Sequence, residues 1–153
     1  MITEEIYNFL KVNDQIATGG QPTVPQLEAA KAEGFASVIN LATLDSRNSL
    51  EDEAGLVRSL GMNYYHIPVV WEAPQESDFN AFNKVMQQQL PEGKTLIHCA
   101  ANFRVTAFYS LYAEKHLGWT PEQAKEFRSQ IWKDNGDVVW NDFIARIEGQ
   151  IER

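Results

Sequence analysis

The chain has 153 residues, 44% of them hydrophobic and 22% charged, with a formal net charge of −8 and one cysteine. This length fits a single domain over 1–153, which buries roughly 70% of the surface that the unfolded chain exposes. One cysteine excludes an internal disulfide, and the negative charge argues against a nucleic-acid partner, because phosphate backbones bind basic patches.

The sequence also argues against a membrane partner, because no apolar run reaches the roughly 18 residues of a membrane span. Residues 1–5 include two glutamates, whereas a secretory leader begins with basic and then apolar residues. We therefore expect a cytoplasmic location for the chain as it stands, although a longer gene product could carry a leader for export. The sequence contains no signal for an oligomeric state.

The first half of the chain alternates predicted helices and short predicted strands. A capping box at Thr23 to Gln26, with proline in the first turn, predicts a helix that ends at Gly34. The other elements expected in this half are a first helix capped by Thr3 and carrying Ile6, Phe9 and Leu10, an extended piece over 15–18, a strand over 35–41, a helix from Ser49 to Gly61, and a strand over 62–67 closed by Pro68.

The second half continues the alternation. A capping box at Thr120 to Gln123 predicts the start of one helix, and Asp137 predicts the start of the last one. The whole pattern predicts an α/β fold with a mostly parallel central sheet of four or five strands and helices on both faces. The other elements expected in this half are a helix over 78–90 capped by Ser77 and stopped by Pro91, a strand over 94–98, and a helix over 104–117.

The single cysteine follows the predicted strand 94–98, at the carboxyl end where ligands of such sheets bind. After His98-Cys99 comes a loop of small residues and then a helix that opens with Arg104. We expect the backbone amides of this loop and the Arg104 guanidinium to hold the oxygens of a phosphoryl group. The expected phosphate-binding residues are Ala100, Ala101, Asn102, Phe103 and Arg104.

Cys99 is then the expected nucleophile. Helix N-termini and nearby cations favour the thiolate, which is the reactive form of cysteine. The thiolate would attack phosphorus, and the phosphocysteine so formed would be hydrolysed. The plainer interpretation is a buried, unreactive thiol, because cysteine is among the most buried residue types. The strand end, the small loop and the following arginine together favour the nucleophile.

Four segments of the chain occur in a characteristic order: Gly19-Gly20-Gln21-Pro22, Val38-Ile39-Asn40-Leu41, His66-Ile67-Pro68-Val69 and Cys99-Ala100-Ala101-Asn102-Phe103-Arg104. Together they resemble the cysteine-dependent protein tyrosine and dual-specificity phosphatases. They are most similar to a bacterial branch, the phosphatase-like domain also found attached to beta-lactamase-like hydrolases. The resemblance extends from about Gly19 to Gly118. It implies a tyrosine-phosphatase-like α/β fold that hydrolyses phosphomonoesters without a metal or cofactor.

The spacing between Cys99 and Arg104 departs from the usual signature, which has five intervening residues where this chain has four. Either one loop residue is missing, or Asn102 replaces the usual glycine, Thr106 keeps the usual hydroxyl position and only Arg104 has moved. We favour the second alignment, because asparagine tolerates the left-handed backbone that glycine serves. A shift of one helical residue is a rotation of about 100°, so Arg104 should approach the phosphate from another side. We therefore predict good phosphate binding with slow or selective hydrolysis.

The mechanism also needs a general acid that protonates the leaving oxygen. In the resembling family the acid lies in a loop after the second strand, and Glu72 is the nearest carboxylate there. Asp78 is an alternative, although it also fits as a first-turn carboxylate of a helix. Asp45, in the loop over 43–48, is a third candidate.

Two further residues flank the loop. We expect His98 to orient it through hydrogen bonds to the backbone. Thr106 could donate its hydroxyl to the Cys99 sulfur and help to expel it in the second step. The alternative for Thr106 is a bond to a carbonyl one turn back in its own helix.

Two other functions stay open from the residues alone. A rhodanese-like sulfurtransferase would use the short loop to hold a persulfide on Cys99. A non-catalytic module would bind a phosphorylated or sulfated ligand without turnover. Under the leading hypothesis the partner is a phosphorylated protein or a small phosphoester. The few histidines and scattered carboxylates have no metal-site spacing, so we predict no metal.

Overall fold

The structure, a computed structural model, describes residues 2–88 and 93–153. Its centre is a five-stranded sheet in the order β1-β2-β5-β3-β4. Neighbouring strands from β2 to β4 pair in parallel, and β1 alone pairs antiparallel, at the edge. The predicted mostly parallel sheet of four or five strands is therefore confirmed. The strands are β1 (Leu10–Lys11), β2 (Ile16–Gly19), β3 (Phe35–Asn40), β4 (Asn63–His66) and β5 (Lys94–His98).

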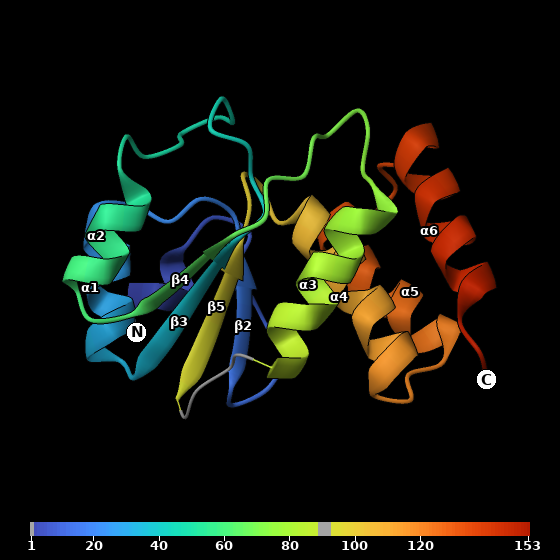
Figure 1. Cartoon of the computed structure of the whole chain (residues 1–153), viewed down its shortest axis with the longest axis horizontal. Coiled ribbons are helices and arrows are strands. Elements are labelled where there is room, and N and C mark those ends of the chain that lie inside the picture. The colour runs from blue at the N-terminus through green and yellow to red at the C-terminus, as the bar shows by residue number, and fades with distance from the viewer. Residues whose placement is uncertain (1, 89–92) are drawn as a thin grey trace.

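Helices cover both faces of this sheet (Figure 1). The helices α1 (Val24–Ala32) and α2 (Glu53–Ser59) lie on one face. On the other side lie α3 (Glu76–Gln88), α4 (Phe103–His116), α5 (Pro121–Trp132) and α6 (Val138–Gln150). Among residues 2–88 and 93–153, no helix is both long enough and apolar enough to cross a lipid bilayer.

The alternation of side chains along each strand divides the core in two. Val38 and Leu96 pack with α1 and α2, whereas their neighbours Ile39 and Ile97 pack with α3 to α6. Successive strand residues face opposite sides, so Cys99, two residues after Ile97, joins the core on the α4 side. The face of the sheet on which Cys99 lies thus determines that it packs on the side of α4.

The predicted caps differ in how well they locate helix starts. Thr23 and Thr120 form complete capping boxes, and Asp137 accepts a hydrogen bond from the Trp140 amide, so these three predictions are confirmed. The helix expected after Ser49 begins later, at Glu53, because the Asp52 side chain accepts from the Gly55 amide. The helix expected over 78–90 begins earlier, at Glu76, so the predicted cap at Ser77 is wrong: Ser77 lies inside the first turn.

The predicted first helix is wrong. Residues Ile2–Glu5 form a 3₁₀-helix, and Leu10 belongs to β1. Thr3 donates its hydroxyl to Glu33, at the end of α1, instead of capping a helix. Asn8 has φ 53, a left-handed value that ends any helix at this point. The predicted helix end at Leu90 and its stop at Pro91 lie outside the described residues.

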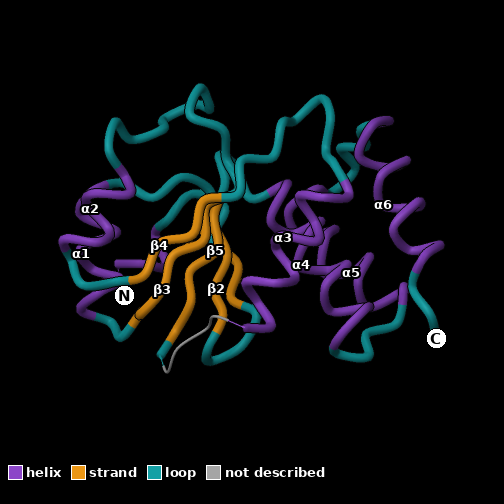
Figure 2. The backbone as a smooth tube through the Cα atoms, in the orientation of Figure 1, coloured by secondary structure: helices purple, strands orange, loops and turns teal. Residues whose placement is uncertain are grey.

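The parallel registers bring the carboxyl ends of the strands together. Gly19 of β2 and Asn40 of β3 both lie opposite His98 of β5, and His66 of β4 lies opposite Asn40. The loops that follow these four strands therefore begin at one edge of the sheet, at the upper ends of the strands in Figure 2. This is the edge at which such sheets bind ligands.

Candidate active site

Cys99 lies at the floor of a pocket at this edge. Its side chain is 1% exposed and packs against the apolar core on the α4 side. The pocket above it has a volume of about 620 Å³. The other lining residues are Arg47, Trp71, Ala100, Ala101, Phe103 and Arg104. The two charged residues among them are arginines, so an anion is the ligand that this lining suits.

Five successive backbone carbonyls of the loop, those of residues 99–103, have hydrogen-bond partners within the protein. The partners are His98 Nδ1 at 3.2 Å from Cys99 O, Gln21 N at 3.0 Å from Ala100 O, Asn8 Nδ2 at 3.0 Å from Ala101 O, Thr106 Oγ1 at 2.8 Å from Asn102 O, and Trp132 Nε1 at 3.1 Å from Phe103 O.

The amides of the same loop are left free for a ligand. Within the described ranges, 2–88 and 93–153, no acceptor meets the amides of Ala100, Ala101, Phe103 and Arg104. In a trans peptide the N–H points opposite to the C=O of the preceding residue, so these amides point away from the partners of those carbonyls. The Asn102 amide lies in the bridge that pairs Gly20 with Ala101. The four amides without an acceptor belong to residues that line one pocket, an arrangement suited to an anion.

Asn102 provides the turn between the loop and α4. Its φ is 70 and its ψ is 3, a left-handed conformation. This is the conformation that the favoured alignment predicted, with asparagine in place of glycine. The side chain is fully buried, and its Nδ2 donates to Asn8 O at 2.8 Å and to Thr18 Oγ1 at 3.0 Å.

Arg104 reaches the pocket although its spacing from Cys99 is short. Its side chain is 6% exposed, and the guanidinium donates to Val69 O at 2.8 Å and to Ser46 Oγ at 3.4 Å. These partners lie in the loops after β4 and β3, so the guanidinium is held between two strand ends. A guanidinium has five N–H donors, which leaves donors for a bound anion.

Two of the three acid candidates lie beside the site and one does not. Glu72 and Asp45 line a smaller pocket of about 300 Å³ that shares Arg47, Trp71, Ala100 and Arg104 with the larger one. Asp78 lines neither pocket, and its carboxylate accepts from the Gln75 amide at 3.0 Å. The helix-start interpretation of Asp78 is therefore the correct one.

The expected role of Thr106 at the sulfur is not what the structure shows. Its hydroxyl donates to Asn102 O at 2.8 Å, one turn back in α4. It also accepts from Trp132 Nε1 at 3.1 Å. Thr106 therefore helps to link the loop to α5, and its single hydroxyl proton is engaged by a carbonyl instead of by Cys99.

His98 contacts the loop backbone as expected. Its second partner, Glu53, was not predicted from the sequence. The side chain is fully buried, with Nδ1 facing Cys99 O and Nε2 2.6 Å from Glu53 Oε2. Gln21 Nε2 donates to the second oxygen of Glu53 at 2.7 Å. Burial raises the pKa of Glu53, but its hydrogen bonds, first that to His98, outweigh burial and hold this pKa below 4.5. No sequence signal linked Glu53 to His98, 45 residues later.

Aromatic residues connect the pocket wall to the C-terminal helices. Trp71 stacks on Trp132 with ring centroids 5.8 Å apart, and Phe103 lies 4.9 Å from the same ring. Trp140 Nε1 donates to Trp71 O at 2.9 Å. The loop that contains Trp71 and Glu72 is therefore held by α6. The loop over 99–104, named the phosphate loop after its predicted ligand, is held by α5. In the part of the chain that the structure describes, no group of three or more His, Cys, Asp and Glu side chains could hold a metal ion.

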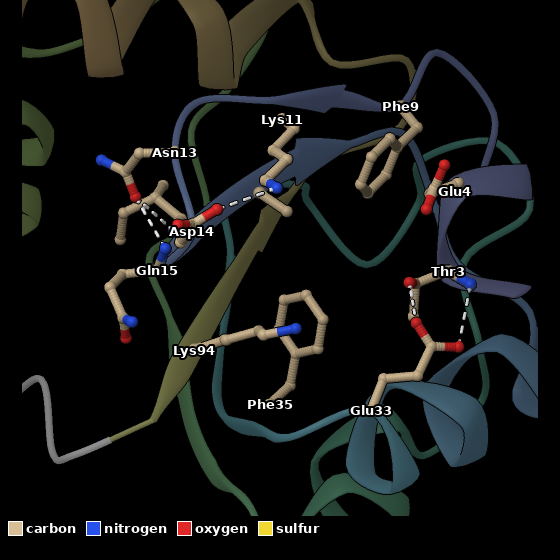
Figure 3. A pocket seen from close by; sticks show the side chains of 12 residues that line it. Thr3, Glu4, Phe9, Lys11, Asn13, Asp14, Gln15, Glu33, Phe35 and Lys94 are labelled. Atoms are coloured by element: carbon tan, nitrogen blue, oxygen red, sulfur yellow. Dashed lines mark hydrogen bonds and ion pairs between the residues drawn. The ribbon is translucent and has the colours of Figure 1, made fainter. Parts of the chain in front are cut away.

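A third pocket lies at the opposite edge, where β2, β3 and β5 begin (Figure 3). Its volume is about 70 Å³, too small for a substrate. Some of its polar groups already have partners: Lys11 pairs with Asp14 at 3.1 Å, and Thr3 bonds to Glu33. We therefore locate the candidate site at the Cys99 edge.

Comparison with known proteins agrees with this geometry. No family model matches the chain. Over 106 residues it is 27% identical to a beta-lactamase hydrolase-like protein of Xylella fastidiosa, a match that covers 67% of this chain and 24% of that protein. The chain thus spans about a quarter of the length of the curated relatives that it matches.

Solved structures extend the likeness to the whole chain. A DUF442 phosphatase-like protein from Shewanella putrefaciens CN-32 is 30% identical with a TM-score of 0.86, and the match covers 97% of this chain and 93% of that one. The catalytic core of the PP-IP phosphatase SIW14 from S. cerevisiae is 12% identical with a TM-score of 0.74, and the match covers 95% of this chain and 91% of that one. The second match shows the fold alone.

The sheet order, the two helical layers and the loop after β5 define a phosphatase-like α/β protein. The chain belongs to the DUF442 family of phosphatase-like proteins. The resemblance to tyrosine and dual-specificity phosphatases, and to the branch found with beta-lactamase-like hydrolases, is thereby confirmed.

Proposed function

We propose that this protein hydrolyses phosphomonoesters of a phosphorylated protein or a small phosphoester through a phosphocysteine on Cys99. One observation carries the proposal: the four loop residues whose amides have no acceptor among residues 2–88 and 93–153 line the same pocket as this cysteine. Such amides, with a buried guanidinium beside them, stabilise the charge on phosphoryl oxygens. The phosphatase neighbours support the same reaction class.

In the first step the Cys99 thiolate attacks phosphorus, and a sulfur–phosphorus bond replaces the bond to the leaving oxygen. Glu72 gives its proton to that oxygen as a general acid. In the second step a water molecule attacks the phosphocysteine and gives a proton to the Glu72 carboxylate. Inorganic phosphate leaves, and the thiolate is restored. Arg104 and the loop amides hold the three remaining phosphoryl oxygens through both steps.

We expect turnover to be slow. Cys99 packs against apolar side chains and is 1% exposed, so the phosphoryl group of a substrate has to reach a buried nucleophile through the pocket. Two donors of Arg104 are already engaged by Val69 and Ser46. Loss of one well-placed donor typically costs about 10²–10³ in rate. We therefore expect the two bonds of Arg104 to lower the rate of hydrolysis more than the affinity for phosphate.

Hydrolysis of p-nitrophenyl phosphate tests the proposal. Cys99→Ser should abolish turnover while the protein stays folded. Glu72→Gln should lower kcat about 10²-fold or more, because it removes the proton donor. Glu126→Gln, an exposed carboxylate on α5, is the matched control and should leave kcat unchanged. Turnover that survives in Cys99→Ser would disprove the nucleophile.

A non-catalytic phosphate-binding module is the second candidate, favoured by the same engaged arginine and the deeply buried sulfur. It predicts that inorganic phosphate binds equally to the wild type and to Cys99→Ser, with no turnover in either. The sulfurtransferase alternative predicts thiocyanate formation from thiosulfate and cyanide, and the comparisons favour the phosphatase over it.

A further inference from the structure

The N-terminal turn at Tyr7 and Asn8 packs directly against the phosphate loop, although some 90 residues separate them in the chain. Tyr7 O accepts from the Gly20 amide at 2.7 Å. Asn8 makes two bonds to the loop in opposite senses: its Nδ2 donates to Ala101 O at 3.0 Å, and its backbone oxygen accepts from Asn102 Nδ2 at 2.8 Å. We call these two bonds the Asn8 clasp.

The two bonds of the clasp are made at Asn102 and at the peptide that precedes it, where the backbone of the loop is strained. Asn102 is left-handed, a conformation that costs a non-glycine residue about 1 kcal/mol or more and persists only where the surroundings enforce it. One bond of the clasp holds the peptide that enters Asn102, and the other holds its side chain. The left-handed residue is also what places the amides of Ala100 and Ala101 and those of the α4 start around one concavity.

The Ala101 carbonyl also differs from its neighbours in how it is held. Ala100 O is fixed by a backbone amide, and Asn102 O is fixed by Thr106 of the same helix. Ala101 O depends on a side chain from the distant turn. Loss of that side chain would leave this peptide held only at its other end, through the Asn102 amide in the bridge between Gly20 and Ala101, while the rest of the loop stays in place.

We propose that Asn8 is a positioning residue of the phosphate site, whose clasp keeps Asn102 left-handed and the loop amides directed at the bound anion. This inference rests on the proposed function in that an anion must bind the loop. It adds that the N-terminal turn, which precedes the segments resembling the phosphatases, is part of the site.

Calorimetry with inorganic phosphate tests the clasp. Asn8→Gly keeps the positive φ and removes the amide, and Asn8→Asp keeps the shape but cannot donate when ionised. Both should bind phosphate about five- to tenfold more weakly than the wild type, the effect of one hydrogen bond. The control is Asn48→Gly: Asn48 also has a positive φ, 63, and its side chain has no hydrogen bond among residues 2–88 and 93–153. This variant should bind within twofold of the wild type.

A double variant separates positioning from general stability. Glycine adopts the left-handed conformation without cost, so Asn102→Gly should make the clasp dispensable. Asn8→Gly should therefore change phosphate affinity less than twofold in the Asn102→Gly background, whatever its effect on Tm. Equal losses in both backgrounds, or no loss in either, would overturn the inference while leaving the proposed function intact. A wild-type protein that binds no phosphate would overturn both.

Discussion

At the scale of single residues, Gly20 shows how closely the site is packed. A Cβ atom there would lie 2.7 Å from Ala100 O and 3.0 Å from the Tyr7 backbone oxygen. The close approach therefore requires glycine because no side chain fits between the loop and the N-terminal turn. Gly19-Gly20 is thus a packing feature of the phosphate loop.

Gly20→Ala should move the phosphate loop, because neither neighbouring oxygen belongs to a flexible side chain. We expect unfolding in urea to show a loss of about 1–3 kcal/mol and p-nitrophenyl phosphate turnover to fall. Gly149→Ala is the control, since a Cβ at this α6 position meets nothing within 4 Å; it should gain up to about 1 kcal/mol. Full activity in Gly20→Ala would contradict the described packing.

Arg104→Lys tests the guanidinium separately. A lysine is one point charge and cannot hold Val69 O, Ser46 Oγ and an anion in one plane. We expect kcat/KM for p-nitrophenyl phosphate to fall about 10²–10³-fold. Arg146→Lys, at an exposed position on α6, should leave kcat/KM unchanged. Equal activity in the two variants would remove Arg104 from the mechanism.

At the scale of elements, the buried pair of Glu53 and His98 ties the start of α2 to the end of β5. The pKa of Glu53 is lowered in the folded protein, so its contribution to stability is complete above 4.5 and is lost as the pH falls through the lower folded value. Glu53→Gln should be less stable than the wild type at neutral pH by about 3 kcal/mol. Urea unfolding should show this gap closing in acid; a gap independent of pH would contradict the pair.

The contact of α4 with α6 should respond to pH in the opposite sense. Burial, and then the nearby Glu148, raise the pKa of Glu114 on α4 to about 7, although Arg153 opposes the shift. An acid with a raised folded pKa loses stability as the pH rises from 4.5 to about 7. Urea unfolding of Glu114→Gln should therefore show a flatter pH dependence than the wild type. The exposed Glu122→Gln should keep the wild-type slope.

Element prediction succeeded where the signal was local. The capping boxes at Thr23 and Thr120 needed four adjacent residues each, and both located their helices. Prediction failed where a distant partner changed the outcome. Thr3 could have capped a helix, but it bonds to Glu33. Ser49 was the predicted cap of α2, but the helix starts later and is capped by the carboxylate of Asp52.

At the scale of the whole molecule, the same distinction governs the site. The run from His98 to Arg104 is contiguous, so the sequence predicted the loop, its cysteine and its left-handed asparagine. The groups that hold the loop come from Asn8, Gln21, Glu53 and Trp132, which span most of the chain. Only the order of the strands brings these residues to one edge, and no local pattern contains that information.

The most direct test of the account is to trap the phosphoryl group on the protein. The protein is mixed with p-nitrophenyl phosphate, quenched in acid and digested, and the peptides are weighed by mass spectrometry. We predict that the peptide containing Cys99 gains the mass of one phosphoryl group, and that the label disappears in Cys99→Ser. Release of phosphate with no label on Cys99 would contradict the central claim.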